Sequence, residues 1–173
     1  IELRMFAHYL ARYDEGRYAD ILLNGDIHQE NANKIGITRR QVKTVTYCFL
    51  YGGGNQKLGL SYDNMLEPVK AKKKGAEIRK AYMEAIPGLK DLVEATKKVA
   101  EKGTIRSIDG REIHVNSGHK ALNFLLQSSA GVVAKRWCLL TDENLKISNF
   151  EHERYAFVHD EQVLASPPSL AKY

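Results

Sequence analysis

The sequence predicts a helix-rich α+β fold whose strands are confined to about the last 70 of its 173 residues. Residues 1–102 have the apolar spacing of helices, with capping or stop residues at several boundaries. The run TIRSIDGREIHV alternates on both sides of Asp109-Gly110, a dipeptide typical of two-residue hairpin turns. The run RYAFVHDEQVLAS predicts two further strands around the polar tip His159-Asp160-Glu161.

The helices can be bounded from local signals. We expect them at residues 2–12, 14–23, about 26–35, about 39–51, 68–85, 88–102 and about 117–141. Asp26 is suited to cap the third helix, and Pro68 stands at the first position of the fifth, where no N–H is needed. Gly103 follows the sixth helix. The last helix is mostly apolar and should be largely buried.

The stretch TRRQVKTVTYCFLYGGG, residues 38–54, begins with a Thr-x-x-Gln capping box and ends with three glycines. Four side chains recur at four-residue spacing and share one side of its helix: Arg39, Lys43, Tyr47 and Tyr51. Two cations followed by two rings suit a ligand with an anionic tail and a flat head, such as a nucleoside triphosphate. Taken alone, the stretch leaves open an amphipathic helix whose tyrosines face the core.

The tip His159-Asp160-Glu161 places two acids side by side after an apolar strand. Adjacent carboxylates repel each other, so they are either solvated or neutralised by a divalent cation. Magnesium prefers such oxygen ligands and usually takes one or two carboxylates plus substrate phosphates. One hairpin supplies too few ligands for a two-metal site, so another acid must come from elsewhere.

Asn123 and Gln127 lie one helical turn apart in the otherwise apolar last helix, with His119 a turn before them. Amide side chains at this spacing can read acceptor atoms on base edges in a minor groove. The alternative is that they satisfy nearby backbone groups.

The formal net charge of +5 resides in one segment. Residues 68–102 hold ten Lys or Arg and five Asp or Glu, whereas the rest of the chain is balanced. Such a segment indicates a phosphate-bearing partner or, alternatively, a solvated helical face.

No apolar run reaches the roughly 18–20 residues of a membrane span, and no signal-peptide pattern is present. Cys48 and Cys138 are predicted to be buried reduced thiols, which favours the cytoplasm.

Five stretches, in chain order, resemble family A DNA polymerases. RRQVKTVTYCFLYGGG resembles their motif B, Arg-x3-Lys-x3-(Phe/Tyr)-x3-Tyr-Gly, and VHDE resembles motif C. IELRMFAHYLARY resembles the continuation of motif A, and NGDIHQENA and HKALNFLLQSSAG resemble connecting segments. The resemblance covers nearly the whole chain and is closest to phage replicative members, which implies a bacterial host cytoplasm if the protein is phage-encoded.

The resemblance implies the polymerase "right hand", with helix-rich fingers and part of an antiparallel-sheet palm. Residues 1–25 would be a palm segment that follows motif A, and residues 26–103 would be the fingers. Residues 104–173 would be palm, with the hairpin, the long helix and motif C.

The resemblance also implies roles around an incoming deoxynucleotide. Arg39 and Lys43 would bind the triphosphate and assist catalysis, and His28 would join them. Tyr47 would pack under the deoxyribose, where Tyr rather than Phe is associated with readier acceptance of dideoxynucleotides. Tyr51 would stack near the nascent base pair.

Further implied roles concern sugar selection, metal and DNA. Glu2, with Tyr51, would fill the space that a ribose 2′-hydroxyl needs. Asp160 and Glu161 would be catalytic carboxylates that bind two Mg²⁺ ions. Residues implied to contact the primer and template are Gly52, which leaves room for the template base, Asn123, Gln127, His159 and Arg111, with Arg4 in a supporting role.

The implied activity is template-directed DNA synthesis, in which a primer 3′-hydroxyl attacks the α-phosphorus of a dNTP. Partners would be primer–template DNA, dNTP, the remaining polymerase segments and a possible processivity factor, with no membrane. The family's motif A aspartate lies four residues before the position of Ile1, so we expect a fragment that is inactive alone.

Two departures concern the end of the chain. Gln162 directly follows His-Asp-Glu where members usually have an apolar residue, and Pro167-Pro168 interrupts the expected continuation.

Two rival interpretations remain. A single-subunit phage-type RNA polymerase shares the Arg-x3-Lys-x7-Tyr-Gly skeleton, but the Glu2 carboxylate would crowd a 2′-hydroxyl. A non-catalytic nucleic-acid-binding module derived from the polymerase fold would show salt-dependent DNA binding without nucleotide selection.

Overall fold

The computed structural model describes residues 1–170. Its helices are α1 (Glu2–Asp14), α2 (Arg17–Asn24), α3 (Ile27–Ile35), α4 (Arg39–Leu50), α5 (Asn55–Tyr62), α6 (Pro68–Ala85), α7 (Leu89–Ala100) and α8 (Ala121–Ile147). Its strands are β1 (Thr104–Arg106), β2 (Glu112–His114), β3 (Glu153–Val158) and β4 (Glu161–Ala165). The predicted helix-rich α+β class, with the strands after residue 103, is confirmed.

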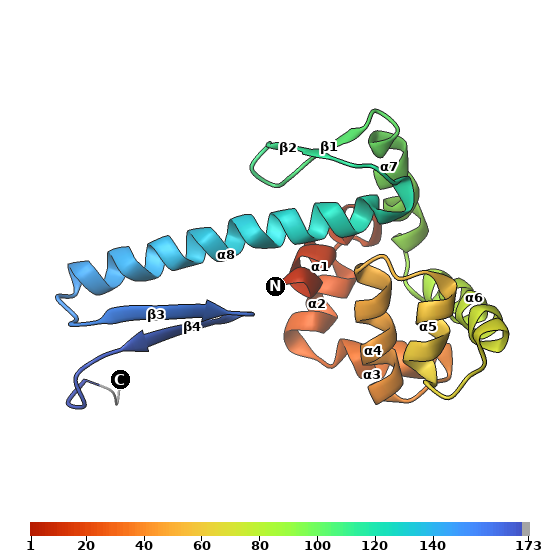
Figure 1. Ribbon diagram of the computed structural model, residues 1–173, viewed down its shortest axis with the longest axis horizontal. Coiled ribbons are helices and arrows are strands. Elements are labelled where there is room, and N and C mark those ends of the chain that lie inside the picture. Colours follow the sequence, from red (N-terminus) through yellow and green to blue (C-terminus); the bar gives the residue numbers. More distant parts are fainter. Residues whose placement is uncertain (171–173) are drawn as a thin grey trace.

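Helices α1 to α7 form a packed body, and α8 starts in it and runs out to one side (Figure 1). Phe6 and Leu10 of α1, Val42 and Val45 of α4 and Tyr82 of α6 are all fully buried at its centre. Apolar residues three or four positions apart lie on one face of a helix. The helix buries that face and leaves the opposite face to solvent. The core therefore fixes which edge of α4 stays accessible.

Helix α5 follows the three glycines and was not expected from the sequence. It crosses α6 so closely that a Cβ at Gly59 would lie 1.9 Å from the carbonyl oxygen of Ala71. A Cβ at Gly75 would lie 1.7 Å from the carbonyl oxygen of Asn55. Glycine at both positions lets the two backbones touch, so α5 and α6 form one tightly packed pair.

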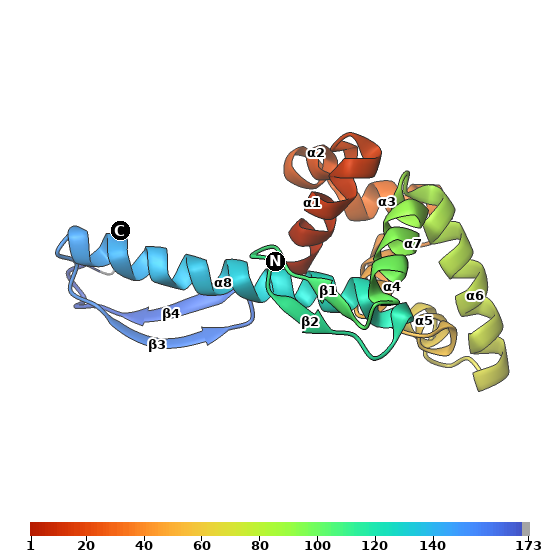
Figure 2. The same ribbon diagram turned by 90° about the horizontal axis from the view of Figure 1, so that it is seen from above.

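Two antiparallel hairpins complete the fold. β1 pairs with β2 beside the start of α8, and β3 pairs with β4 along its far half (Figure 2). The β3–β4 register shifts between Arg154 and Ala156. In the first hairpin Ser107 N–H bonds to the Arg111 carbonyl at 3.0 Å, so the loop is wider than the predicted two-residue Asp109-Gly110 turn.

Several predicted boundaries need correction. The break between the first two helices lies at Glu15 and Gly16, both with positive φ, rather than at residues 13–14. Helix α8 is preceded by a 3₁₀ turn (Gly118–Lys120) and continues to Ile147, beyond the expected residue 141.

Both cysteines are free thiols, and Cys48 is buried whereas Cys138 is half-buried. None of the described helices combines the length and apolarity that crossing a bilayer requires.

Candidate functional site

Helix α4 begins as predicted. The Thr38 hydroxyl accepts a bond from the Gln41 N–H at 3.2 Å, and the Gln41 side chain accepts one from the Thr38 N–H at 3.0 Å. This reciprocal capping box satisfies two of the N–H groups that a helix start leaves open. It fixes the first turn of α4, on which Arg39 stands.

The predicted row of side chains lies along one accessible edge of α4. Arg39 and Lys43 are exposed, and Tyr47 is half-buried. The rings of Tyr47 and Tyr51 stack with centroids 6.4 Å apart and planes 24° apart. The sequence correctly predicted that cations occupy the first part of this edge and rings the second.

Helix α3 supplies a third basic group. The His28 ring lies 6.3 Å from the Tyr47 ring and is largely buried. Burial and then the charge of Arg39 hold the pKa of His28 below its usual value, with Lys43 adding a smaller effect in the same direction. Within residues 1–170 nothing hydrogen-bonds its Nδ1.

The sequence did not indicate that Arg39 has a carboxylate partner. Arg39 Nε donates to Asp26 Oδ2 at 2.7 Å. The other oxygen of Asp26 caps α3 by accepting from the Gln29 N–H at 3.0 Å. Arg39 and this backbone bond lower the pKa of Asp26. Asp26 therefore joins the starts of α3 and α4; the sequence had indicated only its capping role.

At its other end the edge becomes acidic. The Tyr51 hydroxyl lies 3.4 Å from Glu2 Oε1. The amine of Ile1 lies 3.7 Å from Glu2 Oε2 and 2.6 Å from Asp160 Oδ2. Burial raises the pKa of Tyr51, and the carboxylates of Glu2 and Asp160 raise it further. Residues far apart in the chain thus meet here.

We call this row the α4 edge; it comprises Arg39, Lys43, Tyr47, Tyr51, Glu2 and Asp160. Its two ends carry opposite charge, with His28 beside the basic end. A ligand with an anionic tail and flat rings can lie along it, with the tail toward Arg39 and Lys43. Tyr51 contacts Glu2, and the nitrogen of Ile1 lies 3.7 Å from Glu2 Oε2 and 2.6 Å from Asp160 Oδ2, so the acidic tip adjoins the ring end of the α4 edge.

The acidic tip is a two-residue turn. Val158 pairs with Glu161, and His159 and Asp160 form the connection, His159 with φ 53°. The carboxylates of Asp160 and Glu161 are exposed. No group of three or more potential metal ligands occurs among residues 1–170.

The predicted DNA-contacting side chains of α8 start next to the end of α4. Asn123 Nδ2 donates to the Leu50 carbonyl at 3.2 Å, so this amide does satisfy backbone. Gln127, one turn further on, is exposed. Gly52 has φ 71°, and a Cβ there would lie 3.6 Å from Lys120 Cγ, so its backbone angle, rather than lack of space, accounts for the glycine.

Arg111 stands apart from the other predicted residues. Arg111 Nε donates to Asp109 Oδ2 at 2.7 Å at the tip of the β1–β2 hairpin. Figure 1 shows this hairpin on the other side of α8 from α4. Arg4 is exposed on α1. The hairpin that carries Arg111 is not part of the α4 edge.

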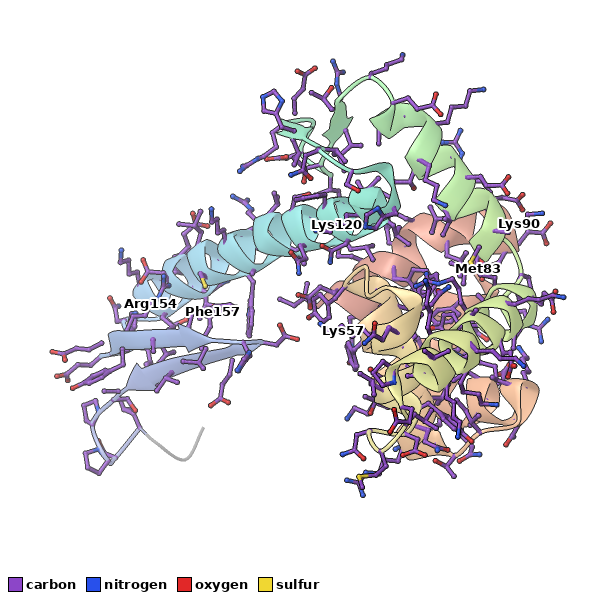
Figure 3. The ribbon with its side chains drawn as sticks, turned by 45° about the vertical axis from the view of Figure 1, so that its right-hand side comes forward. Lys57, Met83, Lys90, Lys120, Arg154 and Phe157 are labelled. Atoms are coloured by element: carbon purple, nitrogen blue, oxygen red, sulfur yellow. The ribbon has the colours of Figure 1, made fainter. Side chains whose placement is uncertain are left out.

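The far half of α8 supports the acidic hairpin. Arg154 donates to the Cys138 carbonyl at 2.6 Å, and the Phe157 ring meets Trp137 edge-on at 5.8 Å. Figure 3 shows Arg154 and Phe157 between β3 and α8. Asp142 adds ion pairs to Lys146 and Arg154 and lies 3.4 Å from His152 Nε2.

Comparison with known proteins identifies the family to which this helix-rich α+β fold belongs. The model for "DNA polymerase family A" matches residues 1–172. The chain belongs to this family. It is 37% identical over 183 residues to a DNA-directed DNA polymerase of Escherichia phage T7, covering 93% of this chain and 25% of the relative.

Two further relatives extend the comparison. A DNA-directed DNA polymerase of Enterobacteria phage T3 is 36% identical over 99% of this chain and 27% of its own length. The chain therefore spans about a quarter of these phage relatives. The fold is similar to that of the POL domain of Pol1 from M. smegmatis, solved with DNA primer-template and dNTP. That comparison has a TM-score of 0.75 and 20% identity, and covers 97% of this chain and 32% of that one.

Proposed function

We propose that this chain is the fingers and part of the palm of a DNA-directed DNA polymerase that extends a primer along a template. The observation that carries the proposal is the α4 edge, where a cationic end suited to phosphates and an acidic end suited to metal lie on one continuous surface. Membership of DNA polymerase family A supports the same activity.

The proposal divides the chain into three segments. Residues 26–103 are the fingers, and residues 1–25 and 104–173 belong to the palm. The dense packing of α4, α5 and α6 supports treating the fingers helices as a unit. The Asn123 bond to Leu50 marks a point where the two parts touch.

In this assignment the triphosphate lies against Arg39 and Lys43, with His28 beside it. Charge-assisted bonds from arginine and lysine to phosphate oxygens are among the stronger polar contacts in proteins. Tyr47 and Tyr51 present their stacked rings to the sugar and base. The lowered pKa of His28 leaves it neutral at neutral pH, so it contributes hydrogen bonding rather than charge.

Sugar selection is assigned to the contact between Glu2 and Tyr51. Their side chains meet at 3.4 Å and close the space beside the rings. A ribose 2′-hydroxyl placed there would have to separate them. This contact favours a deoxynucleotide over a ribonucleotide substrate.

The donor chemistry of the acidic tip fits magnesium. Asp160 and Glu161 offer two exposed, neighbouring carboxylates, and Mg²⁺ takes one or two such ligands with substrate phosphates. These two residues would hold it, with a further carboxylate proposed four residues before the position of Ile1 in a longer polypeptide. Two bound ions would stabilise charge on the attacking and leaving oxygens.

The chain's own groups act on the charge of the leaving pyrophosphate. The 3′-oxygen of the primer forms a bond to the α-phosphorus, and the bond from that phosphorus to pyrophosphate breaks. Arg39 and Lys43 offset the charge that builds on the departing phosphates. Movement of α4 toward the palm would complete the site around a correct base pair, which is selection by induced fit.

The test is primer extension by the polymerase polypeptide that contains these residues. Arg39→Ala and Lys43→Ala should each lower kcat/KM for dNTP by about 10²-fold. Arg40→Ala is the matched control, because Arg40 is also exposed but lies about 100° round α4 from Arg39, in a pocket with Tyr62 and Asp63. It should change kcat/KM less than about twofold.

Other outcomes would decide against the proposal. Equal losses in the Arg39→Ala and Arg40→Ala variants would show that the α4 edge does not bind the nucleotide. Incorporation of rNTP as fast as dNTP would indicate an RNA polymerase. Salt-dependent primer–template binding with no incorporation under any magnesium concentration would indicate a non-catalytic module.

A further inference from the structure

The turn that ends α4, residues 51–54, must hold an unusual backbone. Gly52 has φ 71°. A Cβ at Gly53 would lie 2.4 Å from Cys48 Sγ and 2.7 Å from the Cys48 carbonyl oxygen. We call these four residues the glycine turn. Three successive glycines make it intrinsically flexible, so groups outside the turn must determine its conformation.

One such group is Arg79 of α6. Its guanidinium donates to the Gly53 carbonyl oxygen, and its Nε donates to Asn55 Oδ1 at 2.7 Å. The same guanidinium lies over the Phe49 ring, 5.4 Å from the centroid. One half-buried side chain therefore contacts the last turn of α4, the glycine turn and the start of α5.

Arg79 is itself held on a rigid base. α6 crosses α5 in direct backbone contact at Gly59 and Gly75. Tyr82, one turn after Arg79, is fully buried and its hydroxyl donates to Thr46 of α4 at 3.1 Å. The guanidinium therefore reaches the glycine turn from a fixed position.

The turn is held from a second side by α8. Asn123 donates to the Leu50 carbonyl, the residue just before the turn. Asn123 belongs to α8, which lies outside the packed unit of α4 to α6, whereas Arg79 belongs to α6, inside that unit. Arg79 can thus keep the shape of the turn while α4 and α6 move together.

We propose that Arg79 is a positioning residue that fixes the glycine turn, and through it the orientation of Tyr51 and Gly52 toward the nascent base pair. This inference rests on the proposed function of the α4 edge. Lys43 stands nine residues before Gly52, about 13 Å along the helix. Loss of Arg79 should therefore disturb base-pair selection and kcat while leaving triphosphate binding intact.

The kinetic test uses the same polymerase polypeptide with Arg79→Gln, Arg79→Lys and Arg79→Gly. Arg79→Gln should lower kcat by about tenfold or more and reduce discrimination against mismatched dNTP, with KM for correct dNTP within about twofold. Arg79→Lys should recover only part, because an ammonium lacks the fork that bonds two acceptors at once. Lys80→Gln, an equal loss of charge at the neighbouring exposed position, is the matched control and should leave both parameters unchanged.

Chemical rescue separates positioning from general stability. Millimolar guanidinium should restore kcat of Arg79→Gly but not of Lys43→Ala. Failure of rescue, or a rise in KM equal to the fall in kcat/KM, would overturn the proposal.

A substrate-free measurement distinguishes failure of this inference from failure of the proposed function. In Arg79→Gln, amide hydrogens of residues 52–55 should exchange faster, while those of α7 should not change. If the polypeptide makes no DNA but Arg79→Gln still shows this local change, the proposed function is refuted. Arg79 is then still the residue that orders the turn. Unchanged exchange at residues 52–55 would refute the role of Arg79 whatever the activity.

Discussion

The two ends of the α4 edge stand on very different supports. Lys43 and Arg39 project from a helix whose inner face belongs to the packed body, where side chains such as Phe6 and Tyr82 are wholly buried. Asp160 stands on the arm, by which we mean residues 131–165 of α8, β3 and β4. There Trp137 is 41% exposed and Ile147 80%. Figures 1 and 2 both show the arm projecting from the body.

The difference indicates that the two halves of the site are ordered by different forces. Apolar burial holds the basic half. The acidic half depends on a ring contact and on polar contacts made by Asp142, Arg154 and Gln162, whose amide reaches Thr141 Oγ1 at 3.1 Å. Surface ion pairs contribute little individually, so the acidic tip should be the more mobile half within this chain.

One of the two largest effects expected from this comparison is at Gly75. Gly75→Ala should lower the free energy of unfolding by about 3 kcal/mol, because its Cβ would lie 1.7 Å from a backbone oxygen. Gly131→Ala is the matched change in the arm, where nothing lies within 4 Å of a Cβ. It should raise stability by about 0.5–1 kcal/mol, since alanine favours a helix. Denaturant unfolding of both variants measures the contrast, and similar losses would contradict it.

A pair of phenylalanine truncations should show the same asymmetry. Phe6→Ala, in the body, should cost about 3–5 kcal/mol. Phe157→Ala, at a residue 39% exposed, should cost only about 1 kcal/mol. Its effect should appear as faster amide exchange in β3 and β4 and not in α4. Equal exchange increases in both regions would mean that arm and body unfold together.

A smaller effect is expected at Asp142. Asp142→Asn weakens the pairs with Lys146, His152 and Arg154, and should shift the melting of the arm less than Phe157→Ala does. The shift should vanish in about 1 M salt, which screens exposed charges. Glu143→Gln, at the adjacent exposed position, should have no effect in either buffer.

The smallest expected effect is the pH dependence of the free energy of unfolding of the body. The unfolded chain protonates His28 at its ordinary pKa of 6.5, whereas the folded chain protonates it only at lower pH. The unfolded state therefore binds more protons below pH 6.5, and the free energy of unfolding falls as pH decreases through that window. His28→Gln should flatten this slope between pH 6.5 and 5, and His8→Gln, at an exposed histidine, should not. An unchanged slope in His28→Gln would refute the assignment.

What could be predicted from the sequence was local. The capping box of Thr38 and Gln41, and the four-residue row on α4, depend only on residues within a few turns of each other. Helix α5 was missed because Gly59 in its middle and the glycines before it argue against a helix. Its stability comes from contact with α6, which no local pattern reports.

The site divides in the same way. The order of cations and rings along α4 was visible from spacing, and family resemblance brought Glu2 and Asp160 to the same place. The Asp26–Arg39 pair joins residues 13 apart in the sequence, and the Arg79–Gly53 bond joins residues 26 apart. Neither has a sequence signal, because each depends on how two helices dock.

Because of the Asp26–Arg39 pair, the basic end of the α4 edge should distinguish ligands by the number of negative charges that they carry. An anion that approaches Arg39 meets a guanidinium already matched by a carboxylate 2.7 Å away. A singly charged tail merely exchanges one such partner for another, whereas a triphosphate brings further negative charge that Lys43 can also meet. Inhibition of primer extension by nucleoside mono-, di- and triphosphates should therefore rise steeply with the number of phosphates. Asp26→Asn should flatten that rise by admitting the shorter tails.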